Sequence, residues 1–472
     1  MYQIDFTTPI HIHFIGIGGI SMSGLAEILL EEGFTITGSD SKESPLTRHL
    51  EEKGARIYYG QKASNIEAEP GIQVVVYTAA IHPDNPEFKA AKDKNIPMLT
   101  RAELLGELMR NYKESVAVSG THGKTTTTSM ITDILLAADT DPTISVGGIL
   151  KDIGGNIRVG GPDLFVTEAC EYTNSFLSFY PTIEVILNIE EDHLDFFKDI
   201  NDIRHSFRLF AEKLPKGGLL VINSSIENIN EITSGLPCRI VTFGKDLSSM
   251  YTAQNITYDE FARPSYDLVV QGEIVNRITL GVTGEHNVYN SLAAIAVAEH
   301  YQVPWNVMEQ VLHTLQVPGR IEMLSVSPRF IVLVDYAHNA MALEALLTTL
   351  QDYHPGRIIC IFGCGGNRSA ERRFQMGEVA GRLADLVVVT TDNPRDEDPE
   401  KIADEICKGL DATKGKYGRI PDRGDAIAYG ISHAKPGDIV VIAGKGHEKY
   451  QEICGQKFPM DDRQLAMKCK VW

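Results

Sequence analysis

The sequence predicts an α/β protein of three domains, each built on a mostly parallel β-sheet. Apolar runs bounded by glycine alternate with amphipathic stretches along all 472 residues, a pattern typical of parallel strands joined by helices. The chain is also longer than one hydrophobic core usually fills. The pattern is interrupted twice, at TRAELLGELMRNYKES and at LQVPGRIEML. We therefore expect domains over residues 1–109, 110–318 and 319–472.

The first domain begins with a strand, a glycine loop and a helix, HIHFIGIGGISMSGLAEIL. Gly16, Gly18 and Gly19 form the loop, Ser21 replaces the last glycine of the strict GxGxxG motif, and Asp40 ends the next strand. Such a loop directs backbone N–H groups at a diphosphate, which predicts a Rossmann-like domain. Taken alone, the motif favours an NAD(P)-dependent oxidoreductase. No hydride-transfer site is evident downstream, so this remains the alternative from another enzyme class.

The middle domain begins with the segment SVAVSGTHGKTTTTSM, which reads as a strand, a phosphate loop and a helix. Within it, Lys124 is expected to reach the β- and γ-phosphates of a nucleotide, and Thr125 to hold Mg²⁺. The longer P-loop motif is incomplete, because Val118 stands where its first glycine would be. ATP or GTP binding is the interpretation that we favour.

Two strand ends supply candidate metal ligands. Glu168 ends the strand LFVTE, and NIEEDHLD follows another strand with Asn188, Asp192 and His193. Mg²⁺ prefers oxygen ligands, so Glu168 is the stronger candidate, and a structural role for His193 is about equally probable on chemistry alone. Between about 245 and 285, short alternating strands predict a small antiparallel sheet edge.

Composition and charge narrow the function classes. Hydrophobic residues make up 43% and charged residues 23% of the chain, which is ordinary for a globular protein. The net charge of -19 argues against nucleic-acid and anionic-membrane partners. The seven cysteines lack metal-type spacing, and no apolar run is long enough for a transmembrane helix. We expect a cytoplasmic enzyme with reduced thiols.

Four motifs of the middle domain, in their order and spacing, resemble the Mur ligases of peptidoglycan synthesis: GTHGKTTT, EACEYTNSF, NIEEDHLD and GEHNVYNSLAA. The resemblance implies an ATP- and Mg²⁺-dependent amide ligase that forms an acyl phosphate. The implied catalytic residues are Lys124, His193 and Arg320, and the implied metal ligands are Thr125, Glu168 and His193. The implied ATP-binding residues are Gly120, Thr121, His122, Gly123, Lys124, Thr125, Thr126, Asn188, His286, Asn287, Arg320 and Asp335.

The first two domains resemble the branch of this family that adds L-alanine to UDP-N-acetylmuramate. Ser206 stands about where several other family members carry a carbamylated lysine, and the absence of that lysine is typical of the L-alanine-adding branch. Residues 147–160 would then face the muramyl sugar. The implied UDP-sugar-binding residues are Gly16, Gly18, Gly19, Ser39, Asp40, Thr78 and Ala79.

The third domain resembles a different branch, which adds meso-diaminopimelate to UDP-MurNAc-L-Ala-D-Glu. Its implied amino-acid-binding residues are Arg368, Asn393, Arg395, Gly444 and Glu448. A buried arginine and glutamate left without partners by alanine would cost about 1 to 3 kcal/mol per unmet group. L-Alanine addition is nevertheless favoured, because the first two domains make up about two thirds of the chain. Diaminopimelate is the second acceptor considered and a peptide the third.

Overall fold

The computed structural model describes residues 2–78, 81–150, 153, 155–194, 196–259, 263–315, 321–351, 355–413 and 415–470, without the side chains of 147–150, 155, 345 and 349. The chain forms two compact units. One comprises Met1–Tyr258, Pro264–Gly281 and His286–Leu315, and the other comprises Asp259–Arg263, Val282–Glu285 and Gln316–Trp472. Within the described residues, no helix is long and apolar enough to cross a membrane.

The first domain carries a parallel sheet in the order β3-β2-β1-β4-β5. Its buried positions are largely Ile, Val and Phe, as expected for strands covered by helices on both faces. The strands are β1 (His11–Ile15), β2 (Thr35–Asp40), β3 (Arg56–Tyr59), β4 (Val74–Tyr77) and β5 (Met98–Thr100). The helices are α1 (Ile20–Glu31), α2 (Pro45–Glu52), α3 (Ala63–Glu67), α4 (Pro86–Asp93) and α5 (Arg101–Met109).

The middle domain carries a ten-stranded sheet in the order β15-β14-β13-β12-β11-β10-β6-β9-β7-β8. Its strands are β6 (Glu114–Ser119), β7 (Thr143–Leu150), β8 (Gly155–Arg158), β9 (Leu164–Glu168), β10 (Ile183–Ile186), β11 (Leu219–Asn223), β12 (Arg239–Gly244), β13 (Tyr251–Tyr258), β14 (Pro264–Val270) and β15 (Glu273–Thr279). Its helices are α6 (Lys124–Ala137), the 3₁₀ segment η1 (Tyr172–Ser178), α7 (Ile200–Ala211), α8 (Ile229–Thr233), α9 (Glu285–His300) and α10 (Trp305–Thr314).

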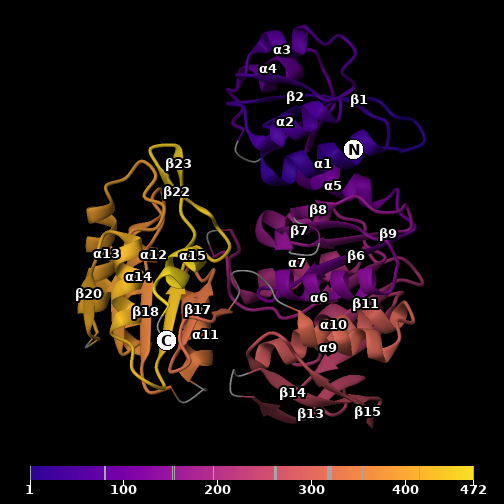
Figure 1. Cartoon of the computed structure of the whole chain (residues 1–472). Coiled ribbons are helices and arrows are strands. Elements are labelled where there is room, and N and C mark those ends of the chain that lie inside the picture. The colour runs from indigo at the N-terminus through magenta and orange to yellow at the C-terminus, as the bar shows by residue number, and fades with distance from the viewer. Residues whose placement is uncertain are drawn as a thin grey trace. The chain divides into compact units, whose positions relative to one another are not determined.

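The predicted antiparallel edge is confirmed. β13, β14 and β15 pair antiparallel at one end of the ten-stranded sheet, seen at the bottom of Figure 1. From β12 to β7 the sheet is parallel, with β6 near its centre between β10 and β9. The phosphate loop therefore follows a strand that is flanked on both sides by strands carrying predicted site residues.

The first and middle domains share one hydrophobic core, which extends from Ile12 and Leu29 to Phe207 and Phe210. α1 also lies very close to β8, since a Cβ added at Gly24 would stand 2.0 Å from Ile157 Cδ1. Only glycine permits this approach. The two domains are thus packed together as one unit.

The third domain carries a six-stranded sheet in the order β16-β17-β21-β18-β19-β20, parallel except for the β16–β17 pair, with an apolar core on each face. Its strands are β16 (Glu322–Leu324), β17 (Ile331–Asp335), β18 (Ile358–Phe362), β19 (Leu386–Val389), β20 (Tyr417–Arg419) and β21 (Ile439–Ala443), with the separate hairpin β22 (Tyr450–Ile453) and β23 (Gln456–Pro459). Its helices are α11 (Ala340–Gln351), α12 (Ala370–Leu383), α13 (Pro399–Asp411), α14 (Arg423–Ser432) and α15 (Asp462–Lys468). The predicted α/β class is confirmed.

Candidate active site

The phosphate loop lies at the carboxyl ends of three neighbouring strands. Strand pairing aligns Val118 of β6 with Glu168 of β9, and Ser119 of β6 with Ile186 of β10. The loop after β6, Glu168 and the segment after β10 therefore meet at one edge of the sheet. Open α/β sheets bind ligands at this edge, because the loops there diverge and leave backbone groups free.

Asn188 holds the loop in shape. Its Oδ1 accepts a hydrogen bond from the His122 amide (2.8 Å), and its Nδ2 donates to the His122 carbonyl (3.1 Å). The Asn188 carbonyl accepts from the Thr121 amide at 3.2 Å. The resemblance implied a place near the adenine for Asn188. In the structure its side chain is committed to the loop backbone.

Lys124 is folded back onto the loop that carries it. Its Nζ donates to the carbonyl of Gly120 and, at 3.2 Å, to that of Thr121. It also lies 3.0 Å from Glu171 Oε2. The side chain of Glu171 is only 3% exposed, whereas that of Lys124 is 17% exposed. Glu171 was not among the predicted site residues, although the motif EACEYTNSF contains it directly before the 3₁₀ segment η1.

The two strongest candidate metal ligands are adjacent. Thr125 Oγ1 donates to Glu168 Oε2 at 3.1 Å, which places two hard oxygens side by side at the start of α6. The predicted ligand His193 stacks on Tyr172 (4.4 Å between ring centroids), and its Nε2 lies 3.8 Å from Glu171. Within the described residues, no three His, Cys, Asp or Glu side chains are grouped as a metal site. Thr125 and Glu168 fit Mg²⁺ by chemistry, since both offer oxygen.

A second polar group supports the loop from α9. Gly123 has φ +84°, and a Cβ there would stand 2.6 Å from Asn290 Oδ1. Asn290 in turn donates to Asn287 Oδ1 at 2.8 Å, and both side chains are buried. Asn287 thus reaches the loop through Asn290, which the sequence prediction omitted, while its predicted neighbour His286 is exposed.

In the first domain the glycine loop is fixed by the end of β2. The Gly18 amide donates to Asp40 Oδ2 (2.8 Å), and the amides of Gly16 and Ile17 donate to the Ser39 carbonyl (2.8 and 2.9 Å). The Ser39 hydroxyl is buried and donates to Glu87. Its side chain therefore supports the loop from inside the domain. Thr78 lies close to Gly16, 3.2 Å from the position of an added Cβ, and Ala79 lies outside the described residues.

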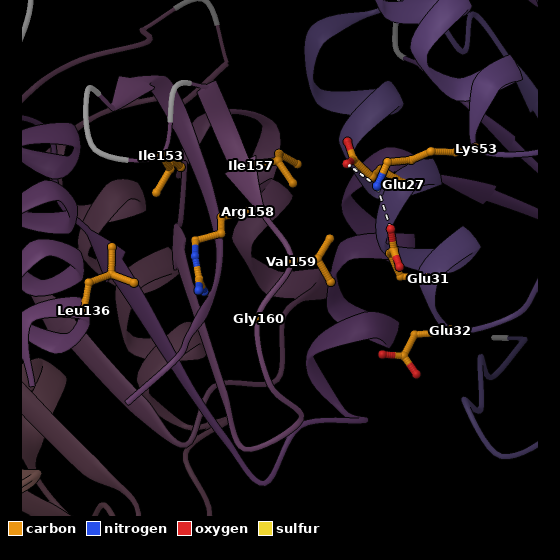
Figure 2. Close-up of a pocket in the computed structure, with 10 residues that line it drawn as sticks. All are labelled: Glu27, Glu31, Glu32, Lys53, Leu136, Ile153, Ile157, Arg158, Val159 and Gly160. Atoms are coloured by element: carbon orange, nitrogen blue, oxygen red, sulfur yellow. Dashed lines mark hydrogen bonds and ion pairs between the residues drawn. The ribbon is translucent and has the colours of Figure 1, made fainter. Parts of the chain in front are cut away.

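A cavity of about 810 Å³ lies between α1 and the β7–β8 hairpin (Figure 2). Glu27, Glu31 and Glu32 of α1 line it, with Lys53 between the first two at 3.0 and 2.5 Å. The described part of the stretch predicted to face the muramyl sugar contributes Ile153 and residues 157–160. Three carboxylates against two cations, Lys53 and Arg158, make the cavity unfavourable for an anionic sugar nucleotide.

The third-domain residues expected to bind a diamino acid are largely bonded to one another. Asn393 Nδ2 donates to Glu448 Oε2 at 2.9 Å, and the fully buried Lys445 donates to Asn393 Oδ1 (2.9 Å) and Glu448 (3.1 Å). Arg395 donates to the Gly366 carbonyl (2.6 Å) and to Glu452 (3.3 Å). Within this group each charged side chain has a partner of opposite charge. We call it the third-domain network, and it consists of Asn393, Arg395, Lys445, Glu448 and Glu452.

Among the described residues, the other predicted residues of the third domain donate no side-chain hydrogen bond to this network. The Arg368 guanidinium donates to the neighbouring Asn367 carbonyl (3.2 Å), and a Cβ at Gly444 would stand 2.7 Å from Asp392. Asp335 is buried at the end of β17 and accepts from the amides of Ile321 (2.8 Å) and Ala337 (2.7 Å). Arg320 lies outside the described residues.

Three family patterns match the chain in order. They are the Mur ligase family, catalytic domain, at residues 11–113, the Mur ligase middle domain at 118–298, and the Mur ligase, glutamate ligase domain at 319–446. A UDP-N-acetylmuramate--L-alanine ligase of Lachnospira eligens is 49% identical over 452 residues, 94% of this chain and 98% of that protein. The enzyme of the same name from Agathobacter rectalis is 56% identical over 366 residues, 77% of this chain and 79% of that protein.

Two solved structures are similar to the chain in fold and sequence. UDP-N-acetylmuramate-alanine ligase MurC from Thermotoga maritima is 26% identical with a TM-score of 0.72, covering 98% of both chains. A UDP-N-acetylmuramate:L-alanyl-gamma-D-glutamyl-meso-diaminopimelate ligase from Neisseria meningitides is 28% identical with a TM-score of 0.59, covering 66% of this chain and 99% of that one.

These relatives correct one expectation from the sequence. The Lachnospira eligens enzyme matches 94% of the chain, so the match includes the third domain. The comparisons therefore give no support to a third domain of the diaminopimelate-adding branch. Two segments of the third domain, FGCGGNRSAERR and TTDNPRDEDP, are joined by the ion pair of the buried Arg373 with the partly exposed Glu397 (2.8 Å). From the middle-domain site and these matches along its length, the chain belongs to the Mur ligase family of ATP-dependent amide ligases.

Proposed function

We propose that this chain joins UDP-N-acetylmuramate to L-alanine. ATP phosphorylates the muramyl carboxylate, and the amino group of alanine attacks the resulting acyl phosphate, giving an amide, ADP and phosphate. The observation that carries the proposal is the 49% identity to an L-alanine ligase over 94% of the chain. The aligned 94% of the chain reaches all three domains, and so covers both the donor side and the acceptor side of the reaction.

The phosphate loop supplies the charge for phosphoryl transfer. Lys124 stabilises the negative charge that gathers when the γ-phosphate meets a carboxylate, which is a dominant contribution in this chemistry. To do so, its Nζ exchanges the carbonyls of Gly120 and Thr121 for phosphate oxygens. Thr125 and Glu168 would hold Mg²⁺, which supplies further positive charge to the phosphates when it is bound.

The remaining assignments follow the family resemblance and the local contacts. His193 lies near enough to Glu171 to belong to the same charged group as Lys124. Asn188 and Asn287 support the loop, and His286, Arg320 and Asp335 are assigned to ATP. The segment 1–109 binds the UDP-sugar, 110–318 binds ATP, and 319–472 binds the amino acid.

The third-domain network is consistent with a small acceptor. A diamino acid would need Arg395 and Glu448 as partners, but Gly366, Glu452, Asn393 and Lys445 already hold them. Alanine therefore leaves no buried charge unmet here. The cost of about 1 to 3 kcal/mol per group that counted against alanine does not arise.

An acceptor panel tests the proposal. Purified protein with ATP and Mg²⁺ is given UDP-MurNAc with L-alanine, or UDP-MurNAc-L-Ala-D-Glu with meso-diaminopimelate, or UDP-MurNAc with the tripeptide L-Ala-γ-D-Glu-meso-diaminopimelate. Phosphate release and product mass are followed. We expect the first pair to dominate. Product from the second or third pair, with none from the first, contradicts the proposal.

A further inference from the structure

Helix α5 lies along residues 170–180, the segment that carries Glu171. Successive positions of the helix face successive positions of that segment. The Cys170 thiol acts electrostatically on the guanidinium of Arg101 at the start of the helix. In its middle, a Cβ on Gly106 would stand 1.9 Å from the Ser178 carbonyl oxygen, and at its end the Arg110 guanidinium lies 4.7 Å from the Tyr180 ring centroid. These two close approaches and one electrostatic interaction follow the same order along both segments, so α5 packs against residues 170–180.

Arg101 lies between two elements of this unit, strand β5 and the segment that carries Glu171. It is the first residue of α5 and follows β5 directly, so it lies at the carboxyl edge of the first-domain sheet. The helix start is already satisfied, because Thr100 and Glu103 form a capping box. No described carboxylate lies within ion-pair distance of Arg101, and none of its nitrogens has a hydrogen-bond acceptor among the described residues.

The surroundings of Arg101 are those of the phosphate site. Cys170, which acts electrostatically on the Arg101 guanidinium, directly precedes Glu171 and follows Glu168 by two residues. Solvent reaches part of Arg101, although burial lowers the pKa of its guanidinium. Arg101 is thus largely surrounded by protein atoms, is partly open to solvent and has no carboxylate partner among the described residues. A guanidinium in such a position favours binding of an anionic group.

We infer that Arg101 is a binding residue for the carboxylate of the muramyl donor, and that it holds this carboxylate toward the γ-phosphate site. The inference rests on the proposed function for the identity of the donor. A planar guanidinium can take both oxygens of a carboxylate, which fixes the direction of the group as well as its position. The donor then spans from the glycine loop of β1 to Arg101.

The carboxylate is favoured over the diphosphate because of strand order. The glycine loop follows β1, and β5 is separated from β1 by β4. With about 4.8 Å between neighbouring strands, the end of β5 lies roughly 10 Å from that loop. Arg101 is therefore displaced from the predicted diphosphate site toward Cys170 and Glu171, where the reacting group must arrive.

Calorimetry with two ligands tests this assignment in the absence of ATP. UDP-MurNAc carries the lactyl carboxylate and UDP-GlcNAc lacks it, while both carry the diphosphate. We expect Arg101→Met to weaken UDP-MurNAc binding by roughly 10- to 100-fold, the usual range for a lost charged hydrogen-bond pair, and to leave UDP-GlcNAc binding unchanged. Arg101→Lys should restore part of the affinity, since it keeps the charge but loses the fork.

Arg110→Met is the matched control, because it removes an arginine from the same helix where the side chain is 40% exposed and contacts Tyr180. It should bind both ligands like the unmodified protein. Equal weakening of both ligands by Arg101→Met would assign Arg101 to the diphosphate and overturn the inference, as would no weakening of either. If the unmodified protein binds neither ligand, the proposed function itself fails. Thermal unfolding of each variant confirms that it is folded, and Arg101→Lys gives the same comparison should the Met variant not fold.

Discussion

The phosphate loop and the third-domain network each hold a lysine against a glutamate, and the two pairs differ in how replaceable their contacts are. Lys124 lies 3.0 Å from Glu171 and Lys445 lies 3.1 Å from Glu448. Solvent reaches 17% of the Lys124 side chain and none of Lys445. The remaining contacts of Lys124 are carbonyls of its own loop, whereas Lys445 is also bonded to Asn393.

This difference distinguishes a lysine that can bind a ligand from one that stabilises the fold. A lysine that binds phosphate must leave its resting partners at a low cost, and the carbonyls of its own loop can exchange for phosphate oxygens. A fully buried lysine such as Lys445 leaves only at a high cost, because Glu448 and Asn393 would lose their charged donor. The GKT and GKGHE motifs look alike in sequence, but only the first lysine is available to a ligand.

The largest effect is expected from Lys124→Ala. The substitution removes the cation at the transferring phosphoryl group, and we expect kcat to fall by about 10³-fold or more. The midpoint of thermal unfolding should change little, because the side chain packs in no apolar core. A steady-state assay of phosphate release beside a melting curve measures both. Substantial turnover in the folded variant contradicts the assignment.

Lys445→Met should act on stability. It leaves Glu448 and Asn393 short of a buried donor, and breaking such a pair costs about 3 to 5 kcal/mol. Urea unfolding monitored by circular dichroism measures the change. If Lys445→Met unfolds like the unmodified protein but loses turnover, Lys445 contacts a ligand. The distinction drawn between the two lysines would then be wrong.

Glu171→Gln tests the resting contact of Lys124. Without the opposing charge, Lys124 leaves the loop more easily, so ADP should bind roughly 3- to 10-fold tighter, the equivalent of a modest ion pair. Calorimetry in EDTA keeps divalent metal out of the measurement. Glu190→Gln is a suitable control, since Glu190 is exposed and 3.6 Å from His122. Weaker ADP binding in Glu171→Gln would show that Glu171 supports the bound lysine instead.

Glu184 extends the comparison to a buried carboxyl group with no described partner. It lies in β10 of the same sheet, both of its oxygens are unbonded, and burial raises its pKa well above the usual value. The folded protein therefore holds the proton, and the stabilisation is lost as pH rises above the unfolded pKa. Between about pH 5 and about pH 7 the unmodified protein should lose on the order of 1 kcal/mol of stability relative to Glu184→Gln. Parallel pH dependences in urea unfolding would contradict this.

The smallest effect on turnover is expected from Arg395→Ala. Arg395 is bonded to Gly366 and Glu452 within the third-domain network, and is assigned no contact with alanine. We expect kcat/KM for L-alanine to stay within about threefold, less than 1 kcal/mol. Initial rates over a series of alanine concentrations test it. A loss of tenfold or more would place Arg395 at the acceptor.

Patterns in the sequence were sufficient to predict the fold class, the antiparallel edge of β13 to β15 and the phosphate loop. These are local properties: strand and helix periodicity, glycine at a tight turn, and the residues that must follow one another in a loop. The sequence also brought Thr125 and Glu168 to one sheet edge, because both follow strands whose order the α/β pattern constrains.

Which charged residues can meet a ligand depended on packing. The family resemblance implied a pocket that includes Arg395 and Glu448, but the structure shows Arg395 bonded to Gly366 and Glu452, and Glu448 bonded to Asn393, 55 positions away, and to Lys445. Glu171 and Arg101 became visible only once η1 and α5 were packed near the loop. Whether a charged side chain can bind a ligand depends on its hydrogen-bond and ion-pair partners and on its burial. Three-dimensional packing sets both, and a sequence pattern does not contain that packing.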